Sequence, residues 1–308
     1  MAYVKDFTPK RYSINDLTKN FKNISFNARS LGEATDIVEG MVKDKNCLKF
    51  LGLSGALIAG GLRECVVEMI KNKWVDVIVS TGAIITHDIA QCFGERFMQI
   101  DPKNVDDLKL RAKGFDRIYD TVSPVKTMAT MEKNMQKIFG RIKDGEYSTY
   151  ELMNEIGKRI KDSRSIVSSA AKNDVKIIVP ALVDSILGMQ FWMHAQDHRI
   201  AVNEMKDLGY VINLNFDLKE QKRNSGAVIL GGGVPKNFIF QSVLMADKPH
   251  KYVVQITTDR EEFGGLSGAT LEEAKSWGKV DKNSKLSVVC CDYSIAFPII
   301  ISALKERI

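Results

Sequence analysis

LKFLGLSGALIAGGLREC, residues 48–65, changes within a few positions from a strand pattern to a glycine-rich turn and then to a helix pattern. Residues 48–53 form a short apolar run that predicts a buried strand, and residues 62–73 have the spacing of an amphipathic helix. Glycines fill the junction at Gly52, Gly55, Gly60 and Gly61. This order is typical of an α/β fold in which the turn after a strand approaches a ligand.

The same change from strand to helix recurs along the chain. Most of the apolar runs are continuous rather than alternating, which is expected when helices cover both faces of a parallel sheet. The sequence therefore predicts a Rossmann-like, doubly wound α/β fold with a mainly parallel sheet. We expect a single domain over residues 1–308, with a polar, helical insertion at 101–174 that contains no clear strand. The further predicted strands are 75–81, 175–180, 226–231, 252–257 and 286–292.

Composition excludes several classes of protein. The chain is 44% hydrophobic and 27% charged, and its net charge of +6 is spread along its 308 residues, so no nucleic-acid partner is expected. The apolar run at 295–304 is about half a membrane span and contains Pro298, so no membrane segment is expected either. Five cysteines without Cys-x-x-Cys spacing predict reduced, mostly core thiols and a cytoplasmic protein.

Glycines and small polar residues gather where the predicted strands end. They occur at 54–55, 80–83 and 231–233, and again at 264–268 before the last strand. Ligands of such folds lie beyond the carboxyl ends of the strands, where glycines let the backbone approach a phosphate. Each cluster alone could be only a tight turn, but four clusters at one end favour a dinucleotide. The strict G-x-G-x-x-G motif is absent, so an atypical binding mode is expected.

The remaining candidates for chemistry are few. His194 and His198 are spaced i, i+4, but no third ligand is placed near them, so no metal is expected. Cys290 and Cys291 lie within an apolar strand, which predicts a packing role. His87 follows the second predicted strand closely, and both a site role and a structural role remain open.

EEAKSWGKV, residues 272–280, predicts a helix end that carries Trp277 and Lys279. A lysine at this place can simply complement the negative end of the helix dipole. It can also be a nucleophilic amine, which a neighbouring aromatic wall would desolvate. The local sequence alone leaves both interpretations open.

Several motifs together resemble the deoxyhypusine synthase family over nearly the whole chain. The matching stretches are FLGLSGALIAGGLREC (50–65), VDVIVSTGA (75–83), VPALVDSILG (179–188), AVILGGGVPKN (227–237), LSGATLEEAKSWGKV (266–280) and VVCCDYSIAFPII (288–300). The resemblance implies a homotetramer of Rossmann-like subunits that uses NAD to transfer the aminobutyl group of spermidine. The acceptor in that family is a lysine of the hypusine-containing translation factor, and the group is carried as an imine on an active-site lysine.

By this resemblance, individual residues acquire expected roles. Lys279 would be the catalytic lysine, with Trp277, Glu273, Asn237 and His87 at substrate-binding positions. The expected cofactor-binding residues are Ser54, Gly55, Thr81, Gly82, Asp184, Gly232, Gly233, Ser267 and Asp292.

Four positions depart from the eukaryotic pattern of the family. Met189 and Leu266 stand where that pattern has acids, Asn237 replaces a histidine and His87 replaces a glutamate. A buried ammonium without a countercharge is costly, so either the far end of the polyamine is held differently or the substrate differs. Two alternatives to protein modification follow: transfer to putrescine or another small amine, as in homospermidine synthases, or an idle NAD-binding regulator.

Overall fold

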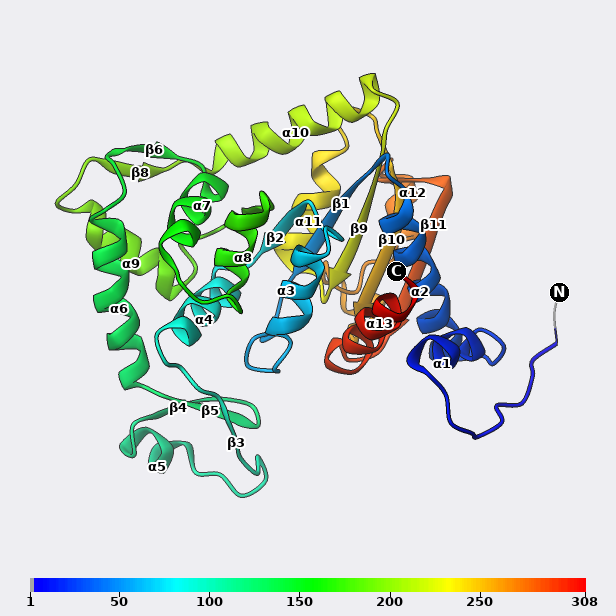
Figure 1. Cartoon of the computed structure of the whole chain (residues 1–308), viewed down its shortest axis with the longest axis horizontal. Helices are drawn as coiled ribbons and strands as arrows, with labels where there is room; N and C mark the ends of the chain where they lie inside the picture. Colours follow the sequence, from blue (N-terminus) through cyan, green and yellow to red (C-terminus); the bar gives the residue numbers. More distant parts are fainter. Residues whose placement is uncertain (1–2) are drawn as a thin grey trace.

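The computed structural model describes residues 3–308, and its centre is a six-stranded sheet in which every pairing is parallel (Figure 1). The strand order is β11-β10-β9-β1-β2-β7, so the two halves of the sheet run outward in opposite directions from the β1–β9 pair. These six strands coincide with the six predicted ones, and the doubly wound α/β fold is confirmed. Their bounds are β1 (Cys47–Leu53), β2 (Val77–Ser80), β7 (Lys176–Ile178), β9 (Asn224–Leu230), β10 (His250–Thr257) and β11 (Val280–Cys290).

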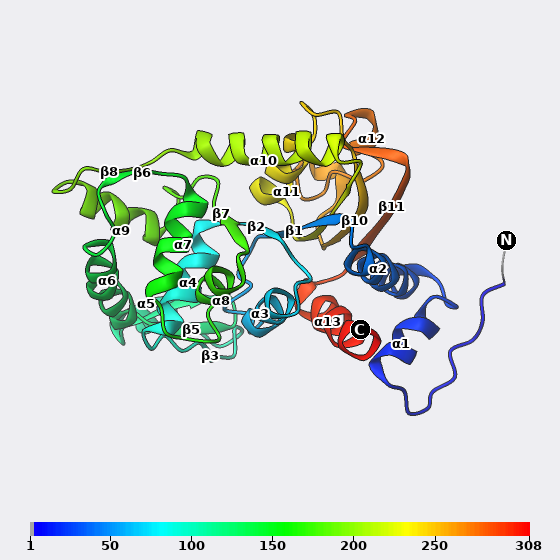
Figure 2. The same cartoon turned by 45° about the horizontal axis from the view of Figure 1, so that its top comes forward.

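Helices cover both faces of the sheet (Figure 2). In β1, Leu51 and Leu53 join the core under one helical layer, whereas Phe50 joins a second core under the other layer. Both cores are apolar, which explains why the strands read as continuous rather than alternating runs. The first layer contains α2 (Phe26–Lys43), α3 (Arg63–Lys71) and α13 (Tyr293–Arg307), and the second contains α10 (Glu204–Glu220), α11 (Gly233–Ser242) and α12 (Glu273–Ser276).

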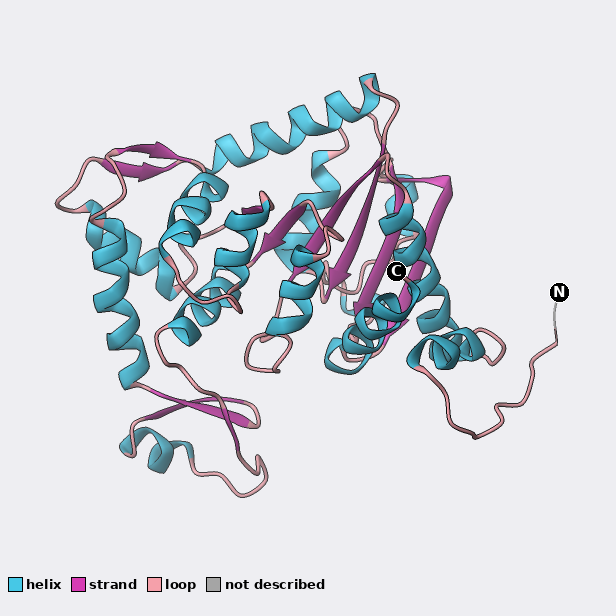
Figure 3. Ribbon diagram, viewed as in Figure 1, coloured by secondary structure: helices cyan, strands magenta, loops and turns pink. Residues whose placement is uncertain are grey.

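Between β2 and β7 the chain forms a helical lobe, of which α7 and α8 pack against the edge strand β7 (Figures 1 and 3). The expectation that 101–174 lacks strands is wrong, because β4 and β5 pair antiparallel with each other and β5 pairs with β3. These strands are short, polar and partly exposed, so they lack the apolar pattern that identifies a strand in a sequence. The elements of this part are α4 (Gly82–Cys92), β3 (Met98–Gln99), α5 (Asp107–Ala112), β4 (Phe115–Ile118), β5 (Thr121–Pro124), α6 (Lys126–Phe139), β6 (Gly145–Tyr147), α7 (Thr149–Arg159) and α8 (Ile166–Asn173).

The remaining elements complete the ends of the chain and two connections. The helix α1 packs against α2 and α13, and β6 pairs parallel with β8. Within residues 3–308, no helix combines the length and the apolar character needed to cross a membrane. The bounds are α1 (Ile14–Phe21), α9 (Ile186–Ala195), β8 (Ile200–Val202) and a short 3₁₀ turn, η1 (Glu261–Phe263).

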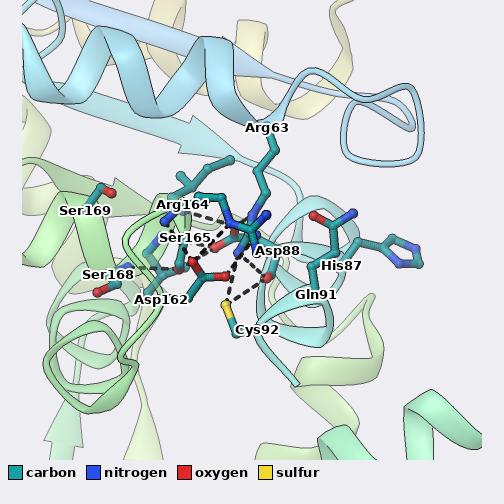
Figure 4. A network of polar contacts seen from close by, with 12 residues as sticks. Arg63, His87, Asp88, Gln91, Cys92, Asp162, Arg164, Ser165, Ser168 and Ser169 are labelled. Carbon is teal, nitrogen blue, oxygen red and sulfur yellow. Dashed lines mark hydrogen bonds and ion pairs between the residues drawn. The ribbon is translucent and has the colours of Figure 1, made fainter. Parts of the chain in front are cut away.

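A buried ion pair joins three of these helices (Figure 4). The guanidinium Nε of Arg63 on α3 lies 2.6 Å from Oδ1 of Asp88 on α4, and both side chains are buried. Asp88 also accepts hydrogen bonds from Ser165 Oγ and from the backbone N–H groups of Ile166 and Val167, at the start of α8. The carboxylate is therefore fully used, and it fixes α4, whose first residue borders the carboxyl end of the sheet.

We predict that Arg63→Leu lowers the free energy of unfolding by about 3 kcal/mol, because removing one partner of a buried ion pair leaves the other buried without its countercharge. Urea denaturation measures the change. Arg164→Leu is the matched control, because Arg164 lies at the exposed margin of the same network and its loss should cost less than about 1 kcal/mol. Equal losses in the two variants would contradict a structural role for the buried pair.

Candidate active site

The order of the strands reverses its direction at the β1–β9 pair. The chain leaves β1 toward α3 on one face and leaves β9 toward α11 on the other, so the two connections separate and leave a crevice. A cavity of about 530 Å³ occupies this place. Its lining residues are Ser54, Gly55, Thr81, Gly231, Gly232, Gly233, Val234, Pro235, Thr257, Thr258, Asp259, Ser267, Cys291, Asp292 and Tyr293. We call it the switch-point cavity.

Ser54 ties the two central strands together at this cavity. Its Oγ donates a hydrogen bond to the carbonyl oxygen of Leu230 (2.8 Å) and accepts one from the N–H of Gly232 (2.9 Å). Gly231 has a φ of +75°, and a Cβ there would lie 2.6 Å from Ser54 Oγ. Glycine at position 231 is therefore required by both backbone conformation and space.

Gly232 brings a second segment against the same turn. A Cβ on Gly232 would lie 2.3 Å from the Cα of Ser267, which is backbone and cannot move aside cheaply. Ser267 Oγ donates a hydrogen bond to Asp259, and this bond lowers the pKa of the Asp259 carboxyl. Turn 231–233 and segment 266–269 thus form adjoining walls of the cavity.

Three helices begin at the rim of the switch-point cavity. Thr81, Gly232 and Asp292 are the N-cap residues of α4, α11 and α13, and all three line the cavity. Helix N-termini present unpaired N–H groups and positive potential, which suit the phosphates of a nucleotide. The cavity combines these termini with hydroxyl groups, glycine backbone and the carboxylates of Asp259 and Asp292. Carboxylates suit the ribose hydroxyls of a dinucleotide, so the residues fit such a ligand.

A second cavity, of about 260 Å³, lies next to the first and contains Lys279. We call it the lysine cavity. Segment 266–269 and the first turns of α11 contribute to the walls of both cavities. Its lining residues are Lys236, Asn237, Phe240, Gln241, Leu266, Ala269, Thr270, Glu273, Ala274, Trp277 and Lys279.

Lys279 is fixed by the way that α12 ends. Gly278 has a φ of +67°, its N–H bonds the carbonyl of Lys275, and the N–H of Lys279 bonds the carbonyl of Ala274 (3.1 Å each). These two bonds around a left-handed glycine form a Schellman motif, with Trp277 as the C-cap. The carbonyl of Lys279 in turn accepts a hydrogen bond from the N–H of His250 on β10 (3.1 Å).

The side chain of Lys279 lies against Trp277. Its Nζ is 5.4 Å from the centroid of the indole, within the range of a cation–π contact. Trp277 is 62% exposed, so its other surface is free to contact a ligand. Glu273 is the one carboxylate that lines the cavity. The arrangement offers a nucleophile, an aromatic wall and a single anchor for an ammonium group.

Lys236 is a site residue that sequence reasoning missed. It is 4% exposed, and its Nζ donates to the carbonyl oxygens of Leu266 (3.0 Å) and Ala269. Burial lowers the pKa of Lys236 to about 8; the charge of Glu273 opposes this shift and the charge of Lys279 adds to it. The sequence contains no local signal for its burial, because lysines are almost never fully buried and its hydrogen-bond partner Leu266 is 30 residues away.

Three expected residues, Gly82, His87 and Asp184, lie outside both cavities. His87 on α4 places Nδ1 3.3 Å from the carboxylate of buried Glu95 and packs edge-on against Phe97. Figure 4 shows its ring turned away from the Arg63–Asp88 network. Asp184 is exposed in the turn after β7 and does not line either cavity. Their assigned roles remain predictions.

The two histidines spaced i, i+4 and the five cysteines were the remaining candidates in the sequence. His194 and His198 stack on each other, with ring centroids 3.9 Å apart. The five thiols are free. Cys47 is in the core, and Cys65, Cys92 and Cys291 are partly buried and pack against it, so the expectation of mostly core cysteines is confirmed. Cys290 is exposed although its strand is apolar, because it lies on the edge strand β11, and Cys291 lines the switch-point cavity.

The family model described as deoxyhypusine synthase matches residues 16–304. A probable deoxyhypusine synthase 1 of Archaeoglobus fulgidus is 40% identical over 96% of this chain and 94% of its own length. Another, from Methanosarcina acetivorans, is 36% identical over 96% of this chain and 92% of its own length. The crystal structure of a putative deoxyhypusine synthase from Entamoeba histolytica superposes with a TM-score of 0.66 at 20% identity and covers 96% of both chains.

We predict that Gly232→Ala lowers the free energy of unfolding by about 1–3 kcal/mol, because the added Cβ overlaps the backbone of Ser267. Chemical denaturation measures the loss. Gly209→Ala on α10 is the control: a Cβ there meets nothing within 4 Å, so that variant should gain up to about 1 kcal/mol. A Gly232→Ala protein as stable as the control would refute the close approach of the two walls.

Proposed function

Because the chain belongs to the deoxyhypusine synthase family, a family of aminobutyl transferases, we propose that it transfers the aminobutyl group of spermidine to a lysine of the hypusine-containing translation factor, with NAD as cofactor. The observation that carries the proposal is the placement of Lys279. It lies in a cavity that shares segment 266–269 with the switch-point cavity. A nucleophilic amine thus adjoins a site suited to a dinucleotide.

NAD would occupy the switch-point cavity and, when bound, would supply the hydride acceptor and donor of the reaction. Gly231–Gly233 and the N-termini of α4, α11 and α13 suit its phosphates. Ser54, Gly55, Thr81, Gly232, Gly233, Ser267 and Asp292 all line this cavity. Gly82 lies directly behind Thr81, where a Cβ would be 2.5 Å from the Ser185 side chain.

Lys279 would carry the transferred group. In its neutral form the amine attacks the imine carbon of the oxidised donor, the diamine leaves, and the four-carbon group remains as an imine on Nζ. The acceptor amine then attacks the same carbon, releases Lys279 and becomes an imine itself. Return of the hydride taken from the donor would convert this imine to the product amine. Trp277 shields the amine and provides a face for a cationic chain, while Glu273 binds an ammonium group of the donor.

The second candidate is transfer to putrescine or another small amine. The observation that favours it is Leu266, which faces the lysine cavity where eukaryotic relatives carry an acid. With Glu273 as the one carboxylate lining the cavity, the selection of polyamines would differ from that in those enzymes. Met189 is on the exposed surface of α9, outside the cavity.

The proposal includes a cytoplasmic homotetramer. His87 and Asp184 line neither the switch-point cavity nor the lysine cavity of their own chain. In such an assembly they could contribute to the site of a neighbouring subunit. Size-exclusion chromatography with light scattering tests this part: a strictly monomeric protein that is fully active would exclude it.

We predict that Lys279→Ala reduces transfer by roughly a thousandfold or more, because no other amine can carry the group on this turn. The assay follows tritium from butyl-labelled spermidine into the acceptor. Lys275→Ala is the control, since that lysine is on the same helix but is paired with Glu272, and its activity should match that of the parent. Transfer by Lys279→Ala at the parent rate would remove the nucleophile assigned here.

The acceptor is tested in the same assay. The protein is incubated with NAD and labelled spermidine, together with the translation factor, putrescine, or both. We expect label in the protein fraction and a clear preference for the factor when both acceptors compete. Label found only in a small polyamine would instead establish the second candidate.

A further inference from the structure

The wall between the two cavities, segment 266–269, is held mostly by side chains. Adjacent residues face opposite ways: Leu266 lines the lysine cavity and Ser267 lines the switch-point cavity. The segment belongs to no strand or helix, so its carbonyl groups need partners from elsewhere in the fold. Because the segment has no hydrogen-bond ladder of its own and separates the two cavities, these partners determine its position.

One side of the wall is held by neutral and anionic groups. Gln255 on β10 donates through Nε2 to the carbonyl oxygens of Ser267 (2.8 Å) and Gly231 (2.9 Å). The hydroxyl of Ser267 donates to Asp259. These contacts fix Ser267 against the glycine turn and belong to the switch-point cavity.

The other side is held by a buried cation. The Nζ of Lys236 on α11 donates to the carbonyl oxygens of Leu266 and Ala269, the first and last residues of the wall. Hydrogen bonds from an ammonium are roughly twice as strong as those from a neutral donor. Lys236 therefore fixes the ends of the wall, while Gln255 fixes its middle.

We propose that Lys236 is a positioning residue whose ammonium clamps segment 266–269 to α11. The clamp fixes the position of the switch-point cavity relative to the lysine cavity. It acts on Ser267 and on the shape of the lysine cavity through the backbone that it binds. This inference deepens the proposed function and depends on it only where NAD is used as a probe.

The charges around Lys236 make the clamp sensitive to pH. Glu273 of α12 and Asp259 after β10 favour its protonated form, whereas burial and the positive charge of Lys279 disfavour it. Because the pKa of Lys236 is lowered to about 8, the ammonium is present at neutral pH and is lost as the pH rises through that value. The neutral amine keeps two N–H groups but loses the charge that strengthens their hydrogen bonds.

The test uses Lys236→Met, which keeps the apolar stem and removes every donor, in the full-length protein. Hydrogen exchange should be about tenfold or more faster in peptides that cover 265–270, while peptides that cover β9 stay protected. Calorimetric titration with NAD should show a dissociation constant raised about tenfold or more, because the residues on either side of Ser267 would be released and Ser267 would be held by Gln255 and Asp259 alone. Lys275→Met is the matched control and should change neither measurement, since Lys275 contacts Glu272 at the surface.

A second measurement needs no variant. In the parent protein, the amide hydrogen-exchange rate of residues 265–270 is measured from pH 7 to 9.5. It is corrected for the intrinsic chemical exchange rate and compared with the exchange rate of β9 at each pH. The clamp predicts an additional acceleration centred near pH 8. This measurement tests the clamp even if Lys236→Met destabilises the whole protein, because it uses the parent protein alone.

Two results would overturn the inference. One is loss of transfer in Lys236→Met with unchanged exchange and unchanged NAD affinity, which would mean that Lys236 contacts the substrate directly. The other is a flat pH profile of the 265–270 exchange in the parent protein. Neither result bears on whether the acceptor is a protein lysine, so failure of the clamp and failure of the proposed function are distinguishable.

Discussion

The structure depends on the contact between the carboxyl ends of β1 and β9. These strands are neighbours in the sheet but far apart in the chain, and their connections leave toward opposite faces. A single hydroxyl, Ser54 Oγ, bridges them by bonding the carbonyl of Leu230 and the N–H of Gly232. Gly232 also lies against the backbone of Ser267. The positions of the walls of both cavities therefore depend on the contact between Ser54 and the turn after β9.

The lysine cavity has an unusual balance of charge for a site expected to bind polyamines. It contains two lysines and one carboxylate, Glu273. The cavity can therefore neutralise one ammonium group of a substrate, and further ammonium groups must stay in water or meet carboxylates outside this cavity. The positive charge of Lys279 also adds to the lowering of the Lys236 pKa that burial causes.

Much of the fold could be predicted because its six central strands carry continuous apolar runs, and those runs follow from burial on both faces. Most of the expected cofactor-binding residues also line one cavity, since strand ends meet at one edge of a parallel sheet. The strands β4 and β5 were missed because they are polar and partly exposed. Lys236 and the Arg63–Asp88 pair were missed because a charge reads as surface in a sequence, whereas its burial depends on partners 25 or more residues away.

The Schellman motif at the end of α12 has a consequence for how a covalent intermediate would travel. The backbone of Lys279 is bonded on both sides, to Ala274 and to His250. Its anchor is therefore rigid, and a group carried on Nζ can sweep only the arc that four methylenes allow. Carrier proteins use long flexible arms to move a bound group between distant active sites, and the lysine side chain is too short for that. Under the proposed mechanism the acceptor amine would have to enter the lysine cavity, so access to this cavity would decide which amines can act as acceptors.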